Sequence, residues 1–150
     1  MRRWTLDRQP QTWHYGLVAR HWAEFQNHRA DAPDVAHVLD LIREHGDPAL
    51  DAGCGTGRIL LPCLRSGLDV DGCDVSPDML SLCRELATGE GFSPALYAQH
   101  MHELDLPRRY RTIFCVGSLG IASTREQDAA ALRRFYELLE ALQDSLSGGR

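Results

Sequence analysis

The sequence predicts an α/β protein with a doubly wound, mostly parallel sheet, of which about four strands are visible, and with helices ahead of it at the N-terminus. Two observations predict this class. Short apolar segments alternate with helical ones along most of the chain, and a glycine-rich turn separates the first strand from the helix that follows it. Such alternation requires crossover connections, which join parallel strands.

Two helices are expected before the sheet. The first spans residues 12–28, where apolar residues recur near helical spacing. The second begins after Asp31 or Asp34 and ends near Gly46. We therefore expect one domain of 150 residues, made of an N-terminal helical segment (1–46) and an α/β core (47–150).

Strands and helices alternate through the core. The strands are short apolar or alternating runs, expected at 49–51, 68–74, 95–98 and 112–116. One helix is expected at 58–65, where Pro62 is tolerable only in the first turn. Another is expected from Pro77 to about Gly89, with Ser76 as N-cap. A last helix follows the capping residues Ser123 and Thr124 and ends before Gly148-Gly149. It is expected to bury Ala130, Leu132, Phe135, Leu138, Leu139 and Leu142.

Composition excludes several function classes. The net charge is -5 and the 16 basic residues, all arginine, are scattered, which argues against a nucleic-acid binder. No apolar run is long enough to cross a membrane, and no apolar run follows the N-terminal arginines as in a secretory signal. The five cysteines form no Cys-x-x-Cys pair, so we expect neither a disulfide framework nor a zinc site, and a cytoplasmic location.

The most specific signal is the turn Leu50-Asp51-Ala52-Gly53-Cys54-Gly55-Thr56-Gly57. Glycines permit positive φ and the close approach of a ligand to the backbone, and the helix that follows supplies free amides. Dinucleotide sites favour G-x-G-x-x-G, whereas the third glycine here arrives one residue earlier. Asp74 ends the second strand, where a carboxylate can accept both hydroxyls of a ribose.

Two stretches of this sequence resemble the class I S-adenosylmethionine-dependent methyltransferases, of the small-molecule methyltransferase domain group. They are Asp51-Ala52-Gly53-Cys54-Gly55-Thr56-Gly57-Arg58 and Asp71-Gly72-Cys73-Asp74-Val75-Ser76-Pro77-Asp78-Met79-Leu80. The resemblance covers roughly residues 12–149 and implies a Rossmann-like core with S-adenosyl-L-methionine as cofactor. It also implies that residues 1–46 form a lid over that cofactor.

The resemblance further implies which residues bind the cofactor. Gly53 and Gly55 would pass close to its methionine part, Asp51 would anchor it through polar contacts, and Asp74 would hold the ribose. Tyr15 of the lid would reach the cofactor's carboxylate. The full set of expected cofactor contacts is Asp51, Gly53, Cys54, Gly55, Asp74, Val75, Met79, His100, Met101 and Tyr15.

The chain departs from the family's pattern in two places. After the third strand the family usually has an aspartate that meets the adenine, and here His100, Gln99 or Met101 with its backbone amide would take that role. The family's sheet has seven strands, so a chain with four is expected to be C-terminally truncated. Its fourth strand would then be an open edge, covered by a loop or by another copy of the chain.

The expected function is therefore methyl transfer to an oxygen, nitrogen or carbon of a small molecule by in-line displacement. The motifs typical of base and glutamine amino-methylation and of cytosine C5 methylation are absent. His100 and His102 are candidates for a general base, because imidazole titrates near neutral pH. A metal site is not expected. Two alternatives remain: a non-catalytic cofactor-binding or assembly module, and a nicotinamide-dependent oxidoreductase fragment.

Overall fold

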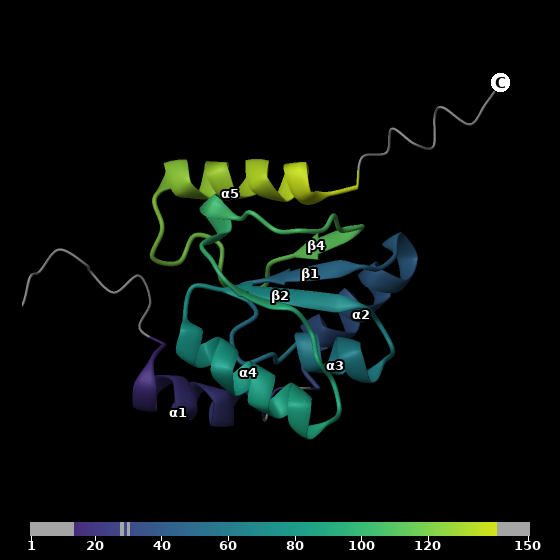
Figure 1. Cartoon of the computed structure of the whole chain (residues 1–150), viewed down its shortest axis with the longest axis vertical. Helices are drawn as coiled ribbons and strands as arrows, with labels where there is room; N and C mark the ends of the chain where they lie inside the picture. The colour runs from purple at the N-terminus through teal and green to yellow at the C-terminus, as the bar shows by residue number, and fades with distance from the viewer. Residues whose placement is uncertain (1–13, 28, 30, 141–150) are drawn as a thin grey trace, which may run out of the picture.

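A computed structural model describes residues 14–27, 29 and 31–140 of the chain and confirms the α/β class. Its sheet has four strands in the order β3-β2-β1-β4, and every neighbouring pair is parallel (Figure 1). The switch of direction after β1 places the carboxyl ends of β1 and β4 side by side, which is where open α/β sheets bind ligands. The strands are β1 (Ala49–Ala52), β2 (Val70–Asp74), β3 (Leu96–Ala98) and β4 (Thr112–Phe114).

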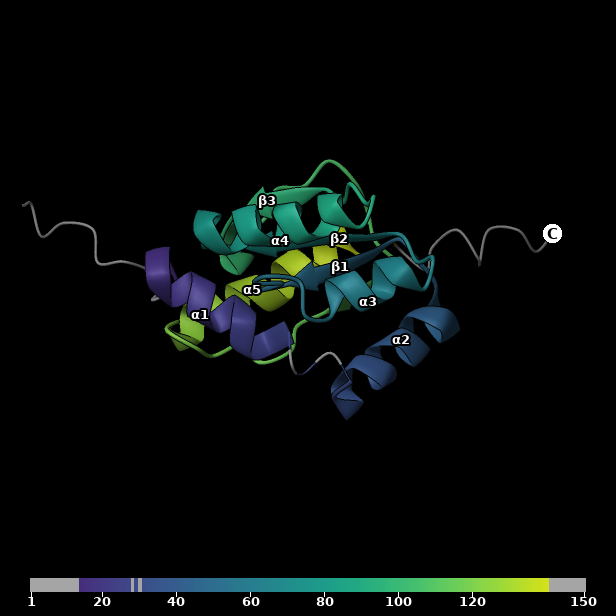
Figure 2. The ribbon, with the colours of Figure 1, turned by 90° about the horizontal axis from the view of Figure 1, so that it is seen from below.

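Helices cover both faces of the sheet. Four of them lie on one side, with α1 packed on α4 at the outer edge, and α5 lies on the other side together with the 3₁₀ turn η1 (Figures 1 and 2). The helices are α1 (Gly16–Asn27), α2 (Pro33–His45), α3 (Leu60–Arg65), α4 (Pro77–Gly89) and α5 (Arg125–Leu138), and η1 spans Met101–Glu103.

The two faces of the sheet contribute to two separate cores because side chains alternate along a strand. On β1, Ala49 faces the core that α2, α3 and α4 complete, whereas Leu50 and Ala52 face the core that includes Phe135 and Leu138 of α5. All four residues of β1 are buried. This strand therefore places the glycine turn that follows it at a fixed position in the middle of the sheet.

Most expected elements are present, with shorter ends. The capping prediction at the last helix is confirmed, since Thr124 Oγ1 accepts the Gln127 N–H and Gln127 Oε1 accepts the Thr124 N–H. The prediction that Leu132 is buried was wrong, because it lies on the outer face of α5 and is 55% exposed.

The expected length of the last helix was also wrong. Helix α5 ends at Leu138, because the next residues turn to pair with the segment before β4. The Tyr110 N–H donates to the Leu138 carbonyl at 2.9 Å, and the Glu140 N–H donates to the Tyr110 carbonyl at 2.8 Å. The part of the prediction that concerns Leu142 falls outside the described residues.

The same two hydrogen bonds attach the segment after α5 to one edge of the sheet. Strand β4 is the outermost strand, as expected, and the segment after α5 covers the end of that edge beside Tyr110. Within the described part of the chain, no helix is long and apolar enough to cross a membrane.

Candidate functional site

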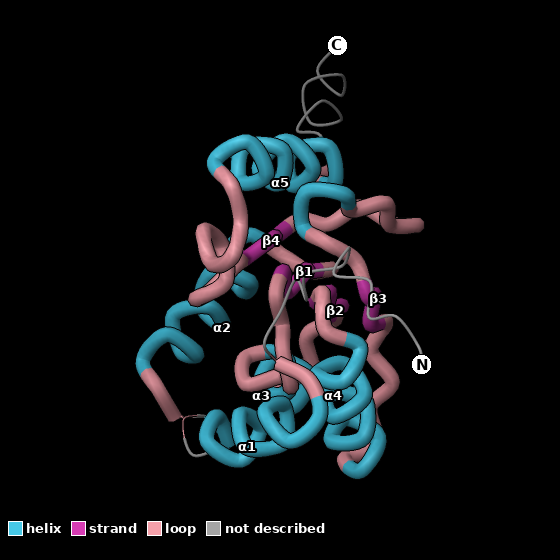
Figure 3. The backbone as a smooth tube through the Cα atoms, turned by 90° about the vertical axis from the view of Figure 1, so that its left-hand side faces the viewer, coloured by secondary structure: helices cyan, strands magenta, loops and turns pink. Residues whose placement is uncertain are grey.

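A cavity of about 540 Å³ opens at the carboxyl ends of the strands, the end of the sheet that faces the viewer in Figure 3. Its floor is the glycine turn after β1. Its walls come from helix α1, from the loop after β2, from the η1 segment and from the loop between β4 and α5. The cavity therefore gathers the segments that follow β1, β2, β3 and β4, as expected for a parallel sheet.

The glycine turn needs its glycines for conformation and for space. Gly53, Gly55 and Gly57 all have positive φ (80°, 55° and 92°), which side chains with a Cβ rarely adopt. A Cβ on Gly53 would lie 2.6 Å from Ser118 Cβ, and one on Gly55 would lie 3.2 Å from the Met79 methyl group. The turn is thus closely packed against two walls of the cavity.

Asp74 joins the end of β2 to this turn. One carboxylate oxygen, Oδ2, accepts the Gly55 N–H at 2.9 Å, and the other accepts the Ser76 N–H at 2.9 Å. Burial raises the pKa of Asp74, and these backbone hydrogen bonds oppose that rise. The carboxylate therefore lines the cavity directly beside the turn, in the position that the sequence predicted for it.

Asp51 is the second carboxyl group of the floor. It lies next to the last residue of β1, has 3% of its surface exposed, and also lines the cavity. Burial, and next the negative charge of Asp74, raise its pKa to about 8, against the opposing effects of Arg58 and of a hydrogen bond from the Leu60 N–H. Two neighbouring acidic groups in a partly dry site favour a ligand that carries positive charge.

The loop after β2 also holds the start of helix α1. The Gly16 N–H donates to Asp78 Oδ2 at 2.6 Å, and Ser76 Oγ donates to the His14 carbonyl. Ser76 Oγ at the same time accepts the Met79 N–H and so caps α4. Helix α1 is thereby fixed beside the cavity.

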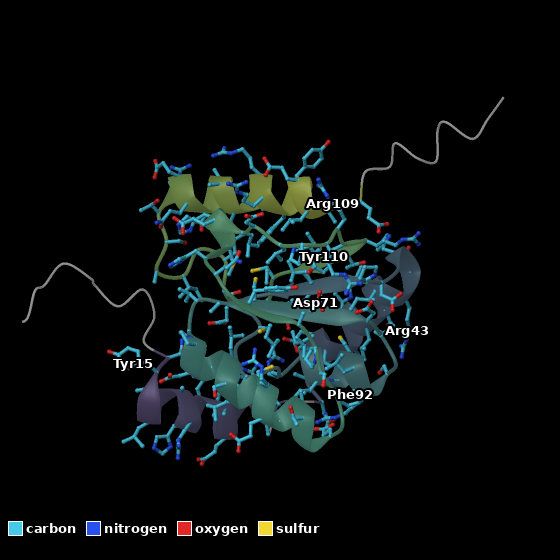
Figure 4. The ribbon with its side chains drawn as sticks, in the orientation of Figure 1. Tyr15, Arg43, Asp71, Phe92, Arg109 and Tyr110 are labelled. Carbon is cyan, nitrogen blue, oxygen red and sulfur yellow. The ribbon has the colours of Figure 1, made fainter. Side chains whose placement is uncertain are left out.

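The expected contribution of Tyr15 was wrong in its geometry. Its side chain is 51% exposed, does not line the cavity, and points away from the body of the molecule in Figure 4. Two nearby aromatic side chains, one just before α1 and one on it, line the cavity in its place. His14 and Trp22 both line the cavity, and their rings lie 4.9 Å apart.

The segment after β3 supplies His100, Met101 and His102 to the cavity wall. The two imidazole rings lie 5.0 Å apart. Burial, and next the charge of His102, lower the pKa of His100, which favours its neutral form. Gln99 is committed elsewhere, because its amide group exchanges two hydrogen bonds with the backbone of Asp105.

Several cavity residues were not predicted. Gln26 and Arg29 extend the α1 wall, and Asp34 with Arg58 closes that end through two hydrogen bonds of 2.9 and 2.7 Å. Gln26 is only 9% exposed, and its Oε1 has no hydrogen-bond partner among the described residues. The loop between β4 and α5 forms the opposite wall. Helix α1 carries several other polar residues, so nothing in the sequence indicated that Gln26 would be buried at this end of the site.

The site thus contains most of the expected residues. From the turn and the β2 loop, the cavity is lined by Asp51, Gly53, Cys54, Gly55, Asp74, Val75 and Met79, and from the β3 side by His100, Met101 and His102. The hydrogen bond with Cys83, and next burial, raise the pKa of the Cys54 thiol. A thiol that stays protonated is a poor nucleophile, so Cys54 acts as a packing residue. Among the described residues no group of three His, Cys, Asp or Glu side chains is placed to hold a metal ion.

Comparison with known sequences assigns most of the α/β core to a known family. The family described as "Methyltransferase domain" matches residues 49–141. A dTDP-3-amino-3,6-dideoxy-alpha-D-glucopyranose N,N-dimethyltransferase of Streptomyces fradiae is 31% identical over 125 residues, which are 81% of this chain and 46% of that protein. A putative methyltransferase of Geobacillus sp. (strain WCH70) is 31% identical over 100 residues, 65% of this chain and 40% of that protein. The chain therefore spans less than half the length of these curated relatives.

Solved structures show the same fold. Magnesium protoporphyrin IX methyltransferase from Synechocystis PCC 6803, with bound SAM, superposes with a TM-score of 0.71 at 20% identity, over 91% of this chain and 74% of that one. DesVI of Streptomyces venezuelae superposes with a TM-score of 0.67 at 26% identity, over 83% of this chain and 52% of that one.

Proposed function

The chain belongs to the methyltransferase-domain family of class I S-adenosylmethionine-dependent methyltransferases, and on that premise we propose that it transfers a methyl group from S-adenosylmethionine to a small-molecule acceptor. The proposal rests mainly on the hydrogen bond that the Gly55 N–H donates to the Asp74 carboxylate. It brings the bare backbone of the turn and the acid of the second strand together on the floor of one cavity. An adenosyl ligand needs both groups at that place.

The residues of the cavity fit the cofactor. The turn leaves open backbone over Gly53 and Gly55, and Asp74 offers carboxylate oxygens for the two ribose hydroxyls. Asp51 offers a buried acid to a positively charged group, which S-adenosylmethionine carries on both its sulfur and its amino nitrogen. Met79 and Val75 supply an apolar surface for the adenine ring.

When bound, the cofactor supplies a methyl carbon that is already activated by the sulfonium, so this chain mainly has to align the acceptor and exclude water. The acceptor's lone pair forms the new bond to that carbon, and the electrons of the broken carbon–sulfur bond remain on sulfur. An acceptor hydroxyl or ammonium must also lose a proton. We assign its removal to His100, because its lowered pKa keeps the imidazole able to accept a proton at neutral pH.

His102 lies beside His100, with Nε2 3.7 Å from Glu103 Oε1, and would hold the first ring in place. The cytoplasm is the proposed location, supported by five cysteines without a Cys-x-x-Cys pair. Three further points stay predictions. They are the pairing of the β4 edge with a second copy of the chain, the absence of nucleic-acid and membrane partners, and the division into a lid (1–46) and a core (47–150).

The deciding experiment is a calorimetric titration of the chain with S-adenosylhomocysteine and with NAD. We expect micromolar or tighter binding of the first and none of the second. NAD binding alone would replace the proposal with the oxidoreductase alternative. Binding of S-adenosylhomocysteine without methyl transfer to any acceptor would favour the non-catalytic binding module instead.

Two variants test whether Gly55 and Asp74 form the cofactor site. Asp74→Ala should weaken S-adenosylhomocysteine binding by about 1–3 kcal/mol, because it removes a charged hydrogen-bond acceptor. Gly55→Val should abolish binding, since its side chain would occupy the floor beside Met79. Circular dichroism checks that both chains fold, and Asp105→Asn, at an exposed aspartate outside the cavity, is the matched control. Unchanged affinity in Asp74→Ala would remove this residue from the site.

A further inference from the structure

The amide of Gln26 is buried where helix α1 lines the cavity. Gln26 follows the buried residues Ala19 and Ala23 along α1, which packs on α4, and it is itself nine-tenths buried. Its Oε1 has no hydrogen-bond partner in the described part of the chain. A buried polar atom without a partner is costly, because it has lost its hydrogen bonds with water. An amide in this state on a cavity wall is available to a polar ligand.

Two arginines line the cavity at the same end. The Arg29 N–H donates to the Gln26 carbonyl at 2.9 Å, and both residues line the cavity. Arg58 lines it as well, and together with Gln26 it also lines a smaller neighbouring cavity of about 260 Å³. Arg58 donates two hydrogen bonds to Asp34, whereas the side chain of Arg29 makes no ion pair with any described residue. The guanidinium of Arg29 is therefore available to an anionic ligand group.

Asp51 places an acid close to these cations. Burial, and next the charge of Asp74, raise the pKa of Asp51, and the positive charge of Arg58 opposes that rise. The hydrogen bonds with Asp34 raise the pKa of Arg58, and the charge of Asp51 contributes to the same rise. Asp51 and the arginine end of the cavity are thus near enough for their charges to interact. The cavity therefore offers an acid and a cationic end to one small ligand group.

An amino-acid group matches this arrangement, because it carries an ammonium and a carboxylate on one carbon. On the premise of the proposed function, we infer that Gln26 and Arg29 bind the carboxylate at the amino-acid end of the cofactor, while Asp51 receives its ammonium group. Guanidinium and amide N–H groups both donate to carboxylates.

The two residues of the α1 wall thereby make the contact that was expected of Tyr15, whose side chain points away from the body of the molecule (Figure 4). An acidic acceptor would also offer a carboxylate to Gln26 and Arg29. It would lack the ammonium group that Asp51 favours, so the cofactor fits this end of the cavity better.

The test compares two ligands in calorimetric titrations of the 150-residue chain. S-adenosylhomocysteine carries the amino-acid end, and 5′-methylthioadenosine has the same adenosine and thioether without it. Gln26→Leu and Arg29→Met remove the inferred contacts, and Arg20→Met is the matched control, because Arg20 is an exposed arginine of α1 outside the cavity.

We expect Gln26→Leu and Arg29→Met each to bind S-adenosylhomocysteine about 10-fold more weakly, as the loss of a hydrogen bond to a charged group does. Both should bind 5′-methylthioadenosine like the wild type, and Arg20→Met should bind both ligands like the wild type. Arg29→Lys keeps the positive charge and should bind S-adenosylhomocysteine more tightly than Arg29→Met does. Circular dichroism checks that each chain folds.

Three results would overturn the inference. The first is wild-type affinity for S-adenosylhomocysteine in Gln26→Leu or Arg29→Met, which would leave an acidic acceptor as the ligand of that residue. The second is an equal loss of affinity for both ligands, which would mean that the residue only supports the cavity wall. The third is an affinity of Arg29→Lys no higher than that of Arg29→Met. Failure of the proposed function is recognised separately, because the wild-type chain would then not bind S-adenosylhomocysteine at all.

Discussion

Asp51 should make the stability of the free protein fall as the pH rises, and Asp51→Asn should reduce that dependence by more than half. The side chain is buried at the end of β1, and burial and the neighbouring Asp74 raise its pKa from 3.8 to about 8. The folded chain therefore keeps the proton up to about pH 8, whereas the unfolded chain releases it near pH 4. Between these values unfolding releases a proton, so a higher pH favours the unfolded state.

The size of the effect follows from the shift. A rise from 3.8 to about 8 spans about 4 units, and one unit corresponds to about 1.4 kcal/mol, which sets a ceiling of about 6 kcal/mol. Structural relaxation and water entry lower the cost of a buried charge, so we expect a loss of about 2–4 kcal/mol between pH 5 and pH 8.5. An asparagine carries no charge at any pH and should flatten this part of the profile.

The assay is urea denaturation at half-unit steps of pH, followed by circular dichroism. Asp105→Asn, which removes an exposed carboxyl group outside the cavity, is the control for the general effect of one charge. We expect the control to follow the wild type and Asp51→Asn to lose less than half as much stability over the range. Parallel profiles for the wild type and Asp51→Asn would refute the reasoning, because they would mean that Asp51 is ionised in the folded protein at neutral pH.

Two further predictions concern buried polar groups. Tyr110→Phe removes the hydroxyl that donates to Asp71 Oδ2 at 2.9 Å on the α5 side of the sheet (Figure 4), and should cost about 1–3 kcal/mol in urea denaturation. Tyr136→Phe, at a highly exposed tyrosine, should cost nothing measurable, and equal effects would contradict the prediction. Gln26→Leu should leave the melting temperature unchanged or raise it, because Oε1 of Gln26 is buried and has no partner in the described part of the chain. A marked fall would show that the amide is bonded in the folded protein.

Much of the site could be predicted because its parts are local in sequence. The glycine turn and Asp74 stand directly after two strands, and parallel strands bring such positions to one edge. Tyr15 shows where this reasoning fails. The start of α1 and the residues just before it carry several aromatic side chains, and only the docking of α1 on α4 decided that His14 and Trp22 line the cavity while Tyr15 does not.

The last helix gives a second example. Its apolar pattern is broad, and Leu132 falls within it as readily as Phe135 does. Only the position of the sheet selects which part of that pattern is buried, because a helix lying on a sheet covers one narrow stripe. The position at which α5 ends could not be predicted from the sequence either, because Leu139 leaves the helix to pair with Tyr110, 29 positions earlier in the chain.

By itself the sequence determined the class of fold and the position of the glycine turn. It also determined the identity of the acid that closes β2, since each of these depends on neighbours within a few residues. The tertiary structure alone decided the raised pKa of Asp51, the burial of the Gln26 amide and the meeting of α1 and the β4–α5 loop around one cavity. Burial and charge at these positions depend on segments that are distant along the chain and meet only when the sheet is assembled.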